Sequence, residues 1–320
     1  MEALLTFGPL AVAFSVLMVV LLVLGSTIYQ QFNPSHDLNN RQVFAVFGWS
    51  LVLVPAFLWG LLLYKSSALQ AENDSRLQAW QANGCVAPAV IRESVFWVTD
   101  KNRRLLGTGF HLEGDLVVTN RHVATPVGNP GYLYSPDGTG FSSPLLHVAD
   151  GETRPDLAFY SGSGPVGEHI PALKLSQVAP QPGDALLVVG NNGDRARFHA
   201  SVVNLLDAAP YAEAERARVS LLTYFVQLTL TYYYLALRPD DLVDSGGRTG
   251  EIYVTQGDTA GGNSGSPVLN CEGEVVGVLF GGSLFNWFAS EQSGLLVALS
   301  DLRQELHIYR EDQNRDYPNT

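Results

Sequence analysis

From Cys85 onward the chain alternates between short apolar runs and clusters of Gly, Pro, Asp and Asn, and this pattern limits the fold more than any other feature. Short runs rich in Val, Ile, Leu and Phe, with turn residues between them, are typical of an all-β sandwich or barrel. Leu299–Glu311 instead carries apolar residues near helical spacing and predicts a C-terminal helix. The predicted strands are Ala89–Val98, Gly107–Leu112, Leu116–Thr119, Ala185–Val189, Ala200–Leu206, Ile252–Thr255 and Val275–Phe280.

The first 64 residues differ in composition from the rest of the chain, because they contain two long runs without a charged residue. Ala3–Ser35 and Gln42–Tyr64 contain no charged residue, and each reaches the roughly 20 residues that a helix needs to cross a bilayer. We therefore expect a transmembrane hairpin with spans at 7–29 and 43–64, which makes the lipid bilayer a partner. A cleaved signal peptide fits less well, because the N-terminus lacks a basic segment and the first run is too long. Two buried core helices are the other alternative.

These boundaries divide the chain into four predicted parts. They are the transmembrane hairpin at 1–64, a polar linker or short helix at 65–85, a folded β-rich domain at 86–310 and a tail at 311–320. Two spans return the chain to the side on which it began. The N-terminus carries only Glu2, which favours its translocation, so we expect the folded domain on the translocated side.

Two cysteines bear on the compartment of this domain. Cys85 comes just before it and Cys271 just after the serine segment described below, and the chain has no others. In an oxidising compartment a lone pair of this kind can form a disulfide. Two unpaired buried thiols are the alternative, and the sequence leaves both open.

Composition argues against several classes of function. The formal net charge is −12 at pH 7, whereas nucleic-acid binding needs a clustered basic surface for the phosphates. The seven histidines are scattered, and the two cysteines have no partner at ligand spacing. We therefore expect no nucleic-acid partner, no metal and no cofactor. The sequence is compatible with an oligomer but does not indicate one.

The strongest chemical signal surrounds Ser264. This serine lies among small residues, with Gly262 before it and Gly265 after it, a pattern that gives a tight bend, an exposed hydroxyl and convergent backbone N–H groups. A serine nucleophile needs a base and a group that orients the base. His122 follows a strand-like run and Asp156 comes 34 residues later. Four other residues are less suitable. His111 lies in a strand-like run, and Asp115 and Asp150 lie beside glycines as turn residues. Ser266 lacks the glycine two residues before it that shapes the oxyanion site.

The order His122, Asp156, Ser264 is that of chymotrypsin-like double β-barrels. Residues 86–310 resemble a bacterial trypsin-like serine protease. They are similar to HtrA/Deg-type proteases in the segments GTGF, TNRHVA, DLA and GDALLVVG, whereas TAGGNSGSPV is closer to the staphylococcal glutamyl endopeptidases. The resemblance implies an all-β, double β-barrel domain with the C-terminal helix, here preceded by two transmembrane helices. We expect no PDZ-like module.

The resemblance also implies a role for each residue. Ser264 attacks the scissile carbonyl, His122 accepts and returns the proton, and Asp156 fixes the imidazole tautomer. The backbone N–H groups of Gly262 and Ser264 form the oxyanion hole. Asn263 stands where digestive relatives carry an aspartate that pairs with an N-terminus freed by cleavage. We therefore expect activity that does not depend on such cleavage.

Asp258 bears on the substrate preference of such an enzyme. It lies six residues before Ser264, where trypsin-like enzymes carry the acid at the base of the primary pocket. This position implies a preference for Lys or Arg. A turn acid after Gly257 is the competing interpretation, and the sequence favours it because pocket loops vary in length among bacterial members.

Four further residues complete the predicted pocket. Thr259 matches a pocket threonine of the glutamyl endopeptidases, but Leu279 stands where these enzymes have a histidine. Glutamate specificity is therefore not expected. Gly281 and Gly282 suit pairing with the extended backbone of a substrate.

The expected function is that of a membrane-anchored serine endopeptidase acting on a protein or peptide substrate. We expect a multi-pass protein of the bacterial inner membrane, with the catalytic domain on the periplasmic or extracellular side. A catalytically silent protease fold that serves as a binding or scaffold module is the alternative. Residues 205–250 form an insertion without a family counterpart, and its uncharged part, Ser220–Leu237, is expected to form a β-hairpin rather than a third span.

Overall fold

The computed structural model describes residues 67–149, 154–191, 198–210, 251–257, 263–282 and 293–316. The chain divides into two compact units, Met1–Glu72 and Asn73–Thr320. The predicted spans at 7–29 and 43–64 lie outside the described residues, as does most of the insertion at 205–250. Within the described ranges, no helix is both long enough and apolar enough to cross a membrane. In the first unit only residues 67–72 are described, and they are helical.

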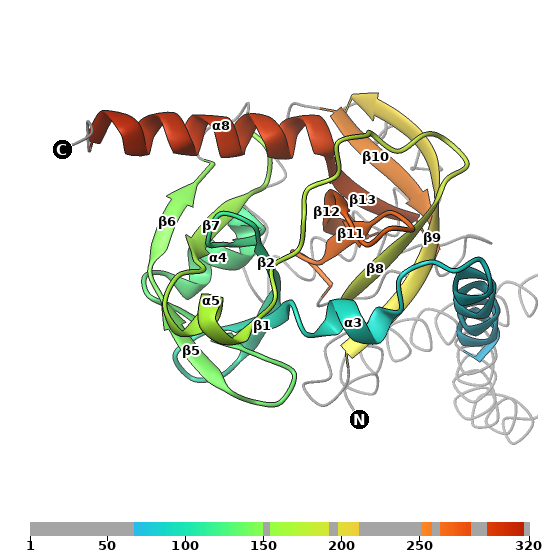
Figure 1. Cartoon of the computed structure of the whole chain (residues 1–320), viewed down its shortest axis with the longest axis horizontal. Coiled ribbons are helices and arrows are strands. Elements are labelled where there is room, and N and C mark those ends of the chain that lie inside the picture. Colours follow the sequence, from blue (N-terminus) through green and yellow to red (C-terminus); the bar gives the residue numbers. More distant parts are fainter. Residues whose placement is uncertain are drawn as a thin grey trace, which may run out of the picture. The chain divides into compact units, whose positions relative to one another are not determined.

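The second unit starts with helical residues 73–82 and continues through two β assemblies to a long last helix (Figure 1). Trp80, which lies in the segment expected to be a linker or short helix, is buried in the core at 4% exposure, and its indole donates to Val86 O. The elements in chain order are α3 (Pro88–Arg92), β1 (Val95–Thr99), β2 (Leu105–Leu112), β3 (Leu116–Thr119), α4 (Arg121–Val127), β4 (Gly131–Tyr134), β5 (Gly140–Ser143), β6 (Leu145–Val148), β7 (Ala158–Ser161), α5 (Pro165–His169), β8 (Ala185–Asn191), β9 (Phe198–Pro210), β10 (Glu251–Gln256), β11 (Pro267–Leu269), β12 (Val275–Gly282), β13 (Ser293–Ala298) and α8 (Leu299–Asp316).

The first β assembly is a seven-stranded sheet in the order β5-β4-β1-β2-β3-β7-β6, and the second is a closed barrel in the order β10-β13-β12-β11-β8-β9. All named pairings within them are antiparallel. Together with α8 they confirm the expected all-β, double-barrel arrangement with a C-terminal helix.

Several strands are apolar throughout because both of their faces are buried. In β3, Val117 packs inside the first sheet, while Leu116 and Val118 face a larger cluster shared with the barrel. In β8, Leu186 and Val188 fill the barrel interior, whereas Leu187 and Val189 face the same shared cluster. Successive side chains of a strand point to opposite faces, so the unbroken apolar runs reflect two cores rather than one.

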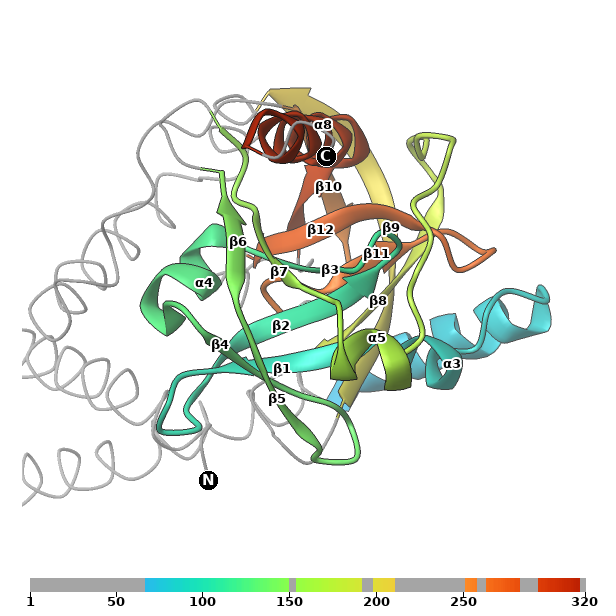
Figure 2. The ribbon, with the colours of Figure 1, turned by 60° about the vertical axis from the view of Figure 1, so that its left-hand side comes forward.

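Helix α8 lies along one side of both β assemblies (Figures 1 and 2). It packs against β12 and β13 of the barrel, and farther along Tyr309 contacts Phe159 of β7 with ring centroids 5.8 Å apart. Leu299, Leu302 and Leu306 are buried on its inner face. This one helix therefore contacts both halves of the domain.

Two sequence predictions need correction. Ala89–Val98 is not one strand, because Pro88–Arg92 forms α3 and β1 begins only at Val95; the fixed φ of Pro88 suits the first position of a helix. The last helix begins at Leu299 as predicted but runs on to Asp316 rather than ending at Glu311. Its last turns carry pairs of opposite charge one turn apart, such as Glu311 with Arg315, which stabilise an exposed helix modestly.

Candidate active site

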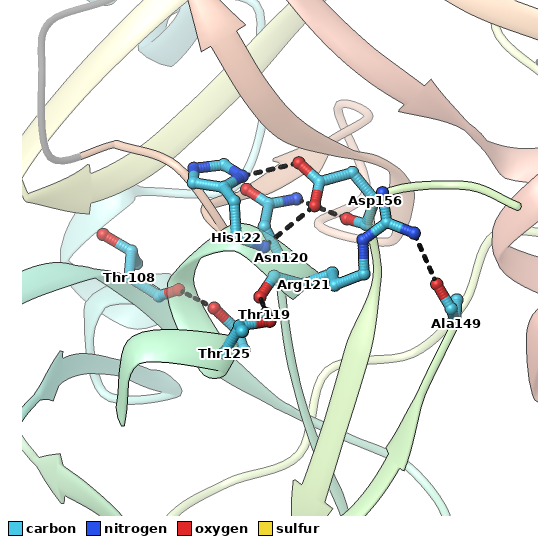
Figure 3. A network of polar contacts seen from close by, with 8 residues as sticks. All are labelled: Thr108, Thr119, Asn120, Arg121, His122, Thr125, Ala149 and Asp156. Carbon is cyan, nitrogen blue, oxygen red and sulfur yellow. Dashed lines mark hydrogen bonds and ion pairs between the residues drawn. The ribbon is translucent and has the colours of Figure 1, made fainter. Parts of the chain in front are cut away.

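The pair formed by His122 and Asp156 is the best-defined part of the site (Figure 3). The Nδ1 atom of His122 lies 2.6 Å from Asp156 Oδ2, and the backbone N–H of His122 donates to Asp156 Oδ1 at 3.0 Å. The aspartate side chain is 1% exposed and that of the histidine 32% exposed. Because an ionised carboxylate only accepts hydrogen bonds, Nδ1 carries the proton and Nε2 is left as the basic atom.

Local structure explains why these two residues meet. His122 is the second residue of α4, and the first backbone N–H groups of a helix have no partner within it, so this one is free for the carboxylate. Asn120, the residue just before α4, is fully buried and donates from its side chain to Asp156 O at 2.8 Å. Arg121 Nη1 donates to Ala149 O at 2.9 Å. Hydrogen bonds from three successive residues therefore hold α4 to the segment around Asp156 (Figure 3).

Tyr160 of β7 supports the far end of the same helix. Its hydroxyl contacts Ala124 O at 3.5 Å and Gly128 O at 3.4 Å. Burial raises the pKa of this phenol far above its ordinary value, so it stays protonated and acts as a donor. The helix that carries His122 is thus fixed at both ends.

Ser264 belongs to the barrel but its backbone is bound to the first sheet. Thr108 N donates to Ser264 O at 2.7 Å. At the neighbouring Gly107, a Cβ would lie 2.8 Å from Ser264 O and 2.6 Å from Val123 Cγ2, so only glycine permits this approach. Val123 directly follows His122 in α4. The serine segment and the histidine helix therefore both pack closely against Gly107.

The turn after the serine depends on Gly265. Its φ of +86° is unfavourable for other residues, and a Cβ there would lie 2.0 Å from Thr108 O. Its N–H donates to Leu279 O at 2.7 Å, while Leu279 N donates to Ser266 O at 3.0 Å. The serine turn is thus bound to β2 on one side and to β12 on the other.

Asn263, next to Ser264, is fully buried. Among the described residues, neither atom of its amide group has a hydrogen-bond partner, and the same holds for Ser266 Oγ. A Cβ on Gly190 would lie 2.9 Å from Asn263 Oδ1 and 1.8 Å from Ser266 Oγ, so both side chains face this glycine of β8. A charged aspartate at position 263 would be buried in the same setting.

The remaining predicted site residues fall into two groups. Gly262, Asp258 and Thr259 lie outside the described residues. Leu279 is 2% exposed and packs in the barrel interior, so its side chain is core and its backbone holds the serine turn. A Cβ on Gly281 would have no atom of the described residues within 4 Å, and Gly282 pairs with Gly294 of β13.

The rejected alternatives have structural roles where the structure describes them. His111 is buried in β2, with Nδ1 2.8 Å from Ile170 O. Asp115 adopts a positive φ of 58° in the turn between β2 and β3. Asp150 lies outside the described residues. In the described part of the chain, no group of acidic, histidine or cysteine side chains is arranged to hold a metal ion.

Cys85 and Cys271 are joined by a disulfide that links positions 186 residues apart. Val86 N also donates to Cys271 O at 2.8 Å. The covalent link fastens the segment before α3 to the turn between β11 and β12.

An ionic cluster that the sequence did not indicate lies close to the site. It consists of Glu305 on α8, Arg154 and His147 of β6. Burial alone raises the pKa of the Glu305 carboxyl, but hydrogen bonds and charge from His147 and Arg154 outweigh this effect and leave the pKa below its ordinary value. An available signal was the acidic residue on the otherwise apolar face of the predicted helix.

Residues 107–278 match the family described as trypsin-like peptidase domain, and they make up more than half of the chain. The chain belongs to this family. The matched range of the trypsin-like peptidase domain includes His122, Asp156 and Ser264. No curated protein matches the chain.

Three solved structures are similar to this chain. The active form of the Rv3671c protease from M. tuberculosis is 22% identical with a TM-score of 0.49, over 68% of this chain and 82% of that chain. The MamO protease domain from Magnetospirillum magneticum is 13% identical with a TM-score of 0.48, over 67% and 96% of the two chains. A serine protease of human pathogenic astrovirus is 18% identical with a TM-score of 0.40, over 65% and 90%.

Proposed function

We propose that the protein is a membrane-anchored serine endopeptidase that hydrolyses peptide bonds through an acyl-enzyme. The observation that carries this proposal is the buried Asp156 carboxylate, which accepts hydrogen bonds from both the backbone N–H and Nδ1 of His122. A carboxylate in this arrangement orients an imidazole and stabilises its cationic form. A histidine side chain that is held in this way and still 32% exposed is suited to proton transfer.

In the proposed acylation, Ser264 Oγ attacks the substrate carbonyl carbon while His122 Nε2 takes the hydroxyl proton. The negative charge that develops on the carbonyl oxygen is stabilised by the backbone N–H groups of Gly262 and Ser264, each contributing about 3 kcal/mol. As the carbon–nitrogen bond breaks, His122 passes the proton to the leaving amine. Water then attacks the acyl-enzyme with His122 again acting as the base, which releases the new carboxyl end and restores Ser264.

The end of β12 is the proposed docking edge for substrate. On the side toward β11, the strand pairing ends at Pro267 with Val278, and the next contacts are those of Leu279 with the serine turn. Gly281 lies just beyond, and a side chain there would meet none of the described residues within 4 Å. An extended peptide can add to such an open strand edge through its backbone hydrogen bonds. The scissile bond then lies beside Ser264.

Preference for the residue before the scissile bond is assigned to Asp258, with Thr259 beside it. A carboxylate at the base of the pocket pairs with the cationic end of Lys or Arg. Because Leu279 is part of the barrel core, it supplies no polar group for recognition of a glutamate side chain.

The spans at 7–29 and 43–64 are the proposed anchor in the bacterial inner membrane, with the catalytic domain on the periplasmic or extracellular side. The disulfide between Cys85 and Cys271 supports this location, because disulfides persist in oxidising compartments and are rare in the cytosol.

The proposal is tested by cleavage profiling of the full-length protein in detergent. Purified protein and its Ser264→Ala variant are incubated with a denatured protein mixture, and the new peptide ends are sequenced by mass spectrometry. We expect ends that the intact protein produces and the variant does not. Identical profiles would favour the silent scaffold instead. Ends that show no enrichment after Lys or Arg would remove the pocket role of Asp258 while leaving the peptidase proposal in place.

A further inference from the structure

A buried ionic cluster joins the C-terminal helix to the segment that carries Asp156. Glu305 of α8 is 1% exposed, and charged side chains are rarely buried to this degree unless they are paired. Its Oε1 accepts a hydrogen bond from Arg154 Nε at 2.8 Å, and its Oε2 pairs with Arg154 Nη2. His147 Nε2 lies 3.2 Å from the same Oε2. One carboxylate thus binds both prongs of a guanidinium and an imidazole.

Aromatic rings enclose this cluster. The His147 ring stacks on Phe159 with centroids 5.4 Å apart, and Tyr309 meets both rings edge-on at 5.8 Å. Because the Glu305 side chain is only 2% exposed, its charge interacts more strongly with its partners and tolerates less change in geometry than a carboxylate on the surface. The two-pronged contact also fixes the plane of the guanidinium, which a lysine could not reproduce.

The backbone between Arg154 and Asp156 is short and stiff. Pro155 lies between them, and its ring restricts the φ angle of the only intervening residue. Leu157 N donates to Pro155 O at 2.9 Å, and Ala149 N donates to Leu157 O at 3.0 Å. The backbone of this segment therefore has little conformational freedom. A displacement of Arg154 is expected to move the Asp156 carboxylate that contacts His122.

The same helix also contacts the strand that holds the serine turn. Leu302 and Leu306 of α8 pack in the shared core together with Val275 and Val278 of β12. One residue beyond Val278, the carbonyl of Leu279 accepts the N–H of Gly265. Helix α8 is therefore connected to the Asp156 segment through charge and to the Ser264 turn through apolar packing.

We propose that Glu305 is a positioning residue for the peptidase reaction. Through Arg154 it sets where Asp156 lies beneath His122, and through α8 it aligns this pair with the strand that holds Ser264. The expected effect of Glu305 on kcat rests on the proposed function. Its effect on the hydrogen bond between His122 and Asp156 does not. Because Glu305 binds Arg154 and His147 beside the Asp156 segment, it acts on the rate of the chemical step and not on substrate affinity.

Three substitutions in the full-length protein test this role. Glu305→Gln keeps the shape of the side chain but removes its negative charge. Arg154→Lys keeps the positive charge but removes the planar guanidinium that makes two contacts with Glu305. Glu311→Gln is the matched control, because it makes the same change on the same helix at a side chain that is 50% exposed. The first readout is kcat and KM for a peptide substrate. The second is the proton magnetic resonance of His122 Nδ1–H, assigned by its loss in His122→Ala, which needs no turnover.

We expect Glu305→Gln to lower kcat by on the order of 10- to 100-fold, the scale on which small displacements of a reacting group act, with KM within about twofold. Arg154→Lys changes kcat in the same direction, and combining it with Glu305→Gln adds little further loss, because the two residues act as one unit. The Nδ1–H resonance shifts in both variants and stays in place in Glu311→Gln.

Unchanged kcat and an unchanged Nδ1–H resonance in folded Glu305→Gln protein would overturn the positioning role. If Glu305→Gln does not fold, Arg154→Lys decides in the same way, since its side chain is 28% exposed and it keeps its charge. If the unmodified protein turns over no peptide, the proposed function fails. In that case the Nδ1–H resonance alone tests the positioning role. A shift of the resonance in the variants would support the role, and an unchanged resonance would overturn it.

Discussion

The sharpest consequence of the site geometry concerns Asp156→Asn, which changes one oxygen of a buried side chain to an amide nitrogen. In the native arrangement both carboxylate oxygens accept hydrogen bonds from His122, one from the backbone N–H at 3.0 Å and one from Nδ1 at 2.6 Å. The backbone N–H can only donate, so the single oxygen of asparagine must take the position beside it. The amide NH₂ then faces Nδ1.

This arrangement forces the imidazole into the wrong tautomer. An NH₂ group facing Nδ1 requires a bare nitrogen there, so the ring proton moves to Nε2 and the base for Ser264 is lost. A change of this kind in a serine protease lowers kcat by about 10⁴-fold, which corresponds to about 5.4 kcal/mol in the activation barrier. Both hydrogen bonds to His122 persist, but in the one at Nδ1 the donor and the acceptor are exchanged. We therefore expect little change in the free energy of unfolding.

The assay is the steady-state hydrolysis of a peptide identified by cleavage profiling, with urea unfolding as the check on folding. Asp312→Asn is the matched control, because it makes the same substitution at an exposed side chain of α8. We expect the loss in kcat with KM nearly unchanged, and no change in the control. A folded Asp156→Asn protein that retains more than about a tenth of the native kcat would refute the tautomer argument.

Three further predictions concern stability, each measured by urea unfolding. Gly265→Ala is expected to cost at least about 2 kcal/mol more than Gly138→Ala, because both glycines have positive φ but only the first would place a Cβ against a backbone atom; equal losses would contradict the clash. Asn263→Asp is expected to cost about 3–5 kcal/mol at pH 8 and less at pH 5, because it buries a charge without a partner at a fully buried position; no loss at pH 8 would contradict this. For Glu305, the lowered folded-state pKa means that the unfolded chain binds its proton first as the pH falls below the ordinary 4.5, so the stabilisation from His147 and Arg154 is present above that pH and lost below it. The pH dependence in this range should be weaker in Glu305→Gln, and an unchanged slope would count against the assignment.

Much of the fold could be predicted because its signals are local. Short apolar runs such as Leu116–Thr119 coincide with β3, and Leu299 correctly marks the start of the last helix. Strands with weaker patterns were missed, among them β5 and β6, whose residues are partly exposed. The error at Ala89–Val98 has the same origin, since an apolar run does not distinguish a helical turn at Pro88–Arg92 from a strand.

The individual segments of the site could also be predicted, but not the contacts that join them. His122 and Asp156 each lie in a recognisable short segment, and the structure brings the two side chains together. The partnership of Arg154 with Glu305 spans 151 residues, and no local pattern indicates which distant element will meet which. For Leu279 the difficulty is of another kind. Its correspondence with a pocket residue of a similar family did not indicate that its side chain lies in the barrel core.

Covalent labelling tests whether Ser264 is a nucleophile that His122 activates. The full-length protein in detergent is treated with a serine-reactive fluorophosphonate, and the modified residue is identified by mass spectrometry of the intact protein and its peptides. We predict one adduct on Ser264, its absence in Ser264→Ala, and labelling slowed by orders of magnitude in His122→Ala. Folded native protein that acquires no adduct would contradict a nucleophilic Ser264, and equal labelling without His122 would contradict its activation by His122.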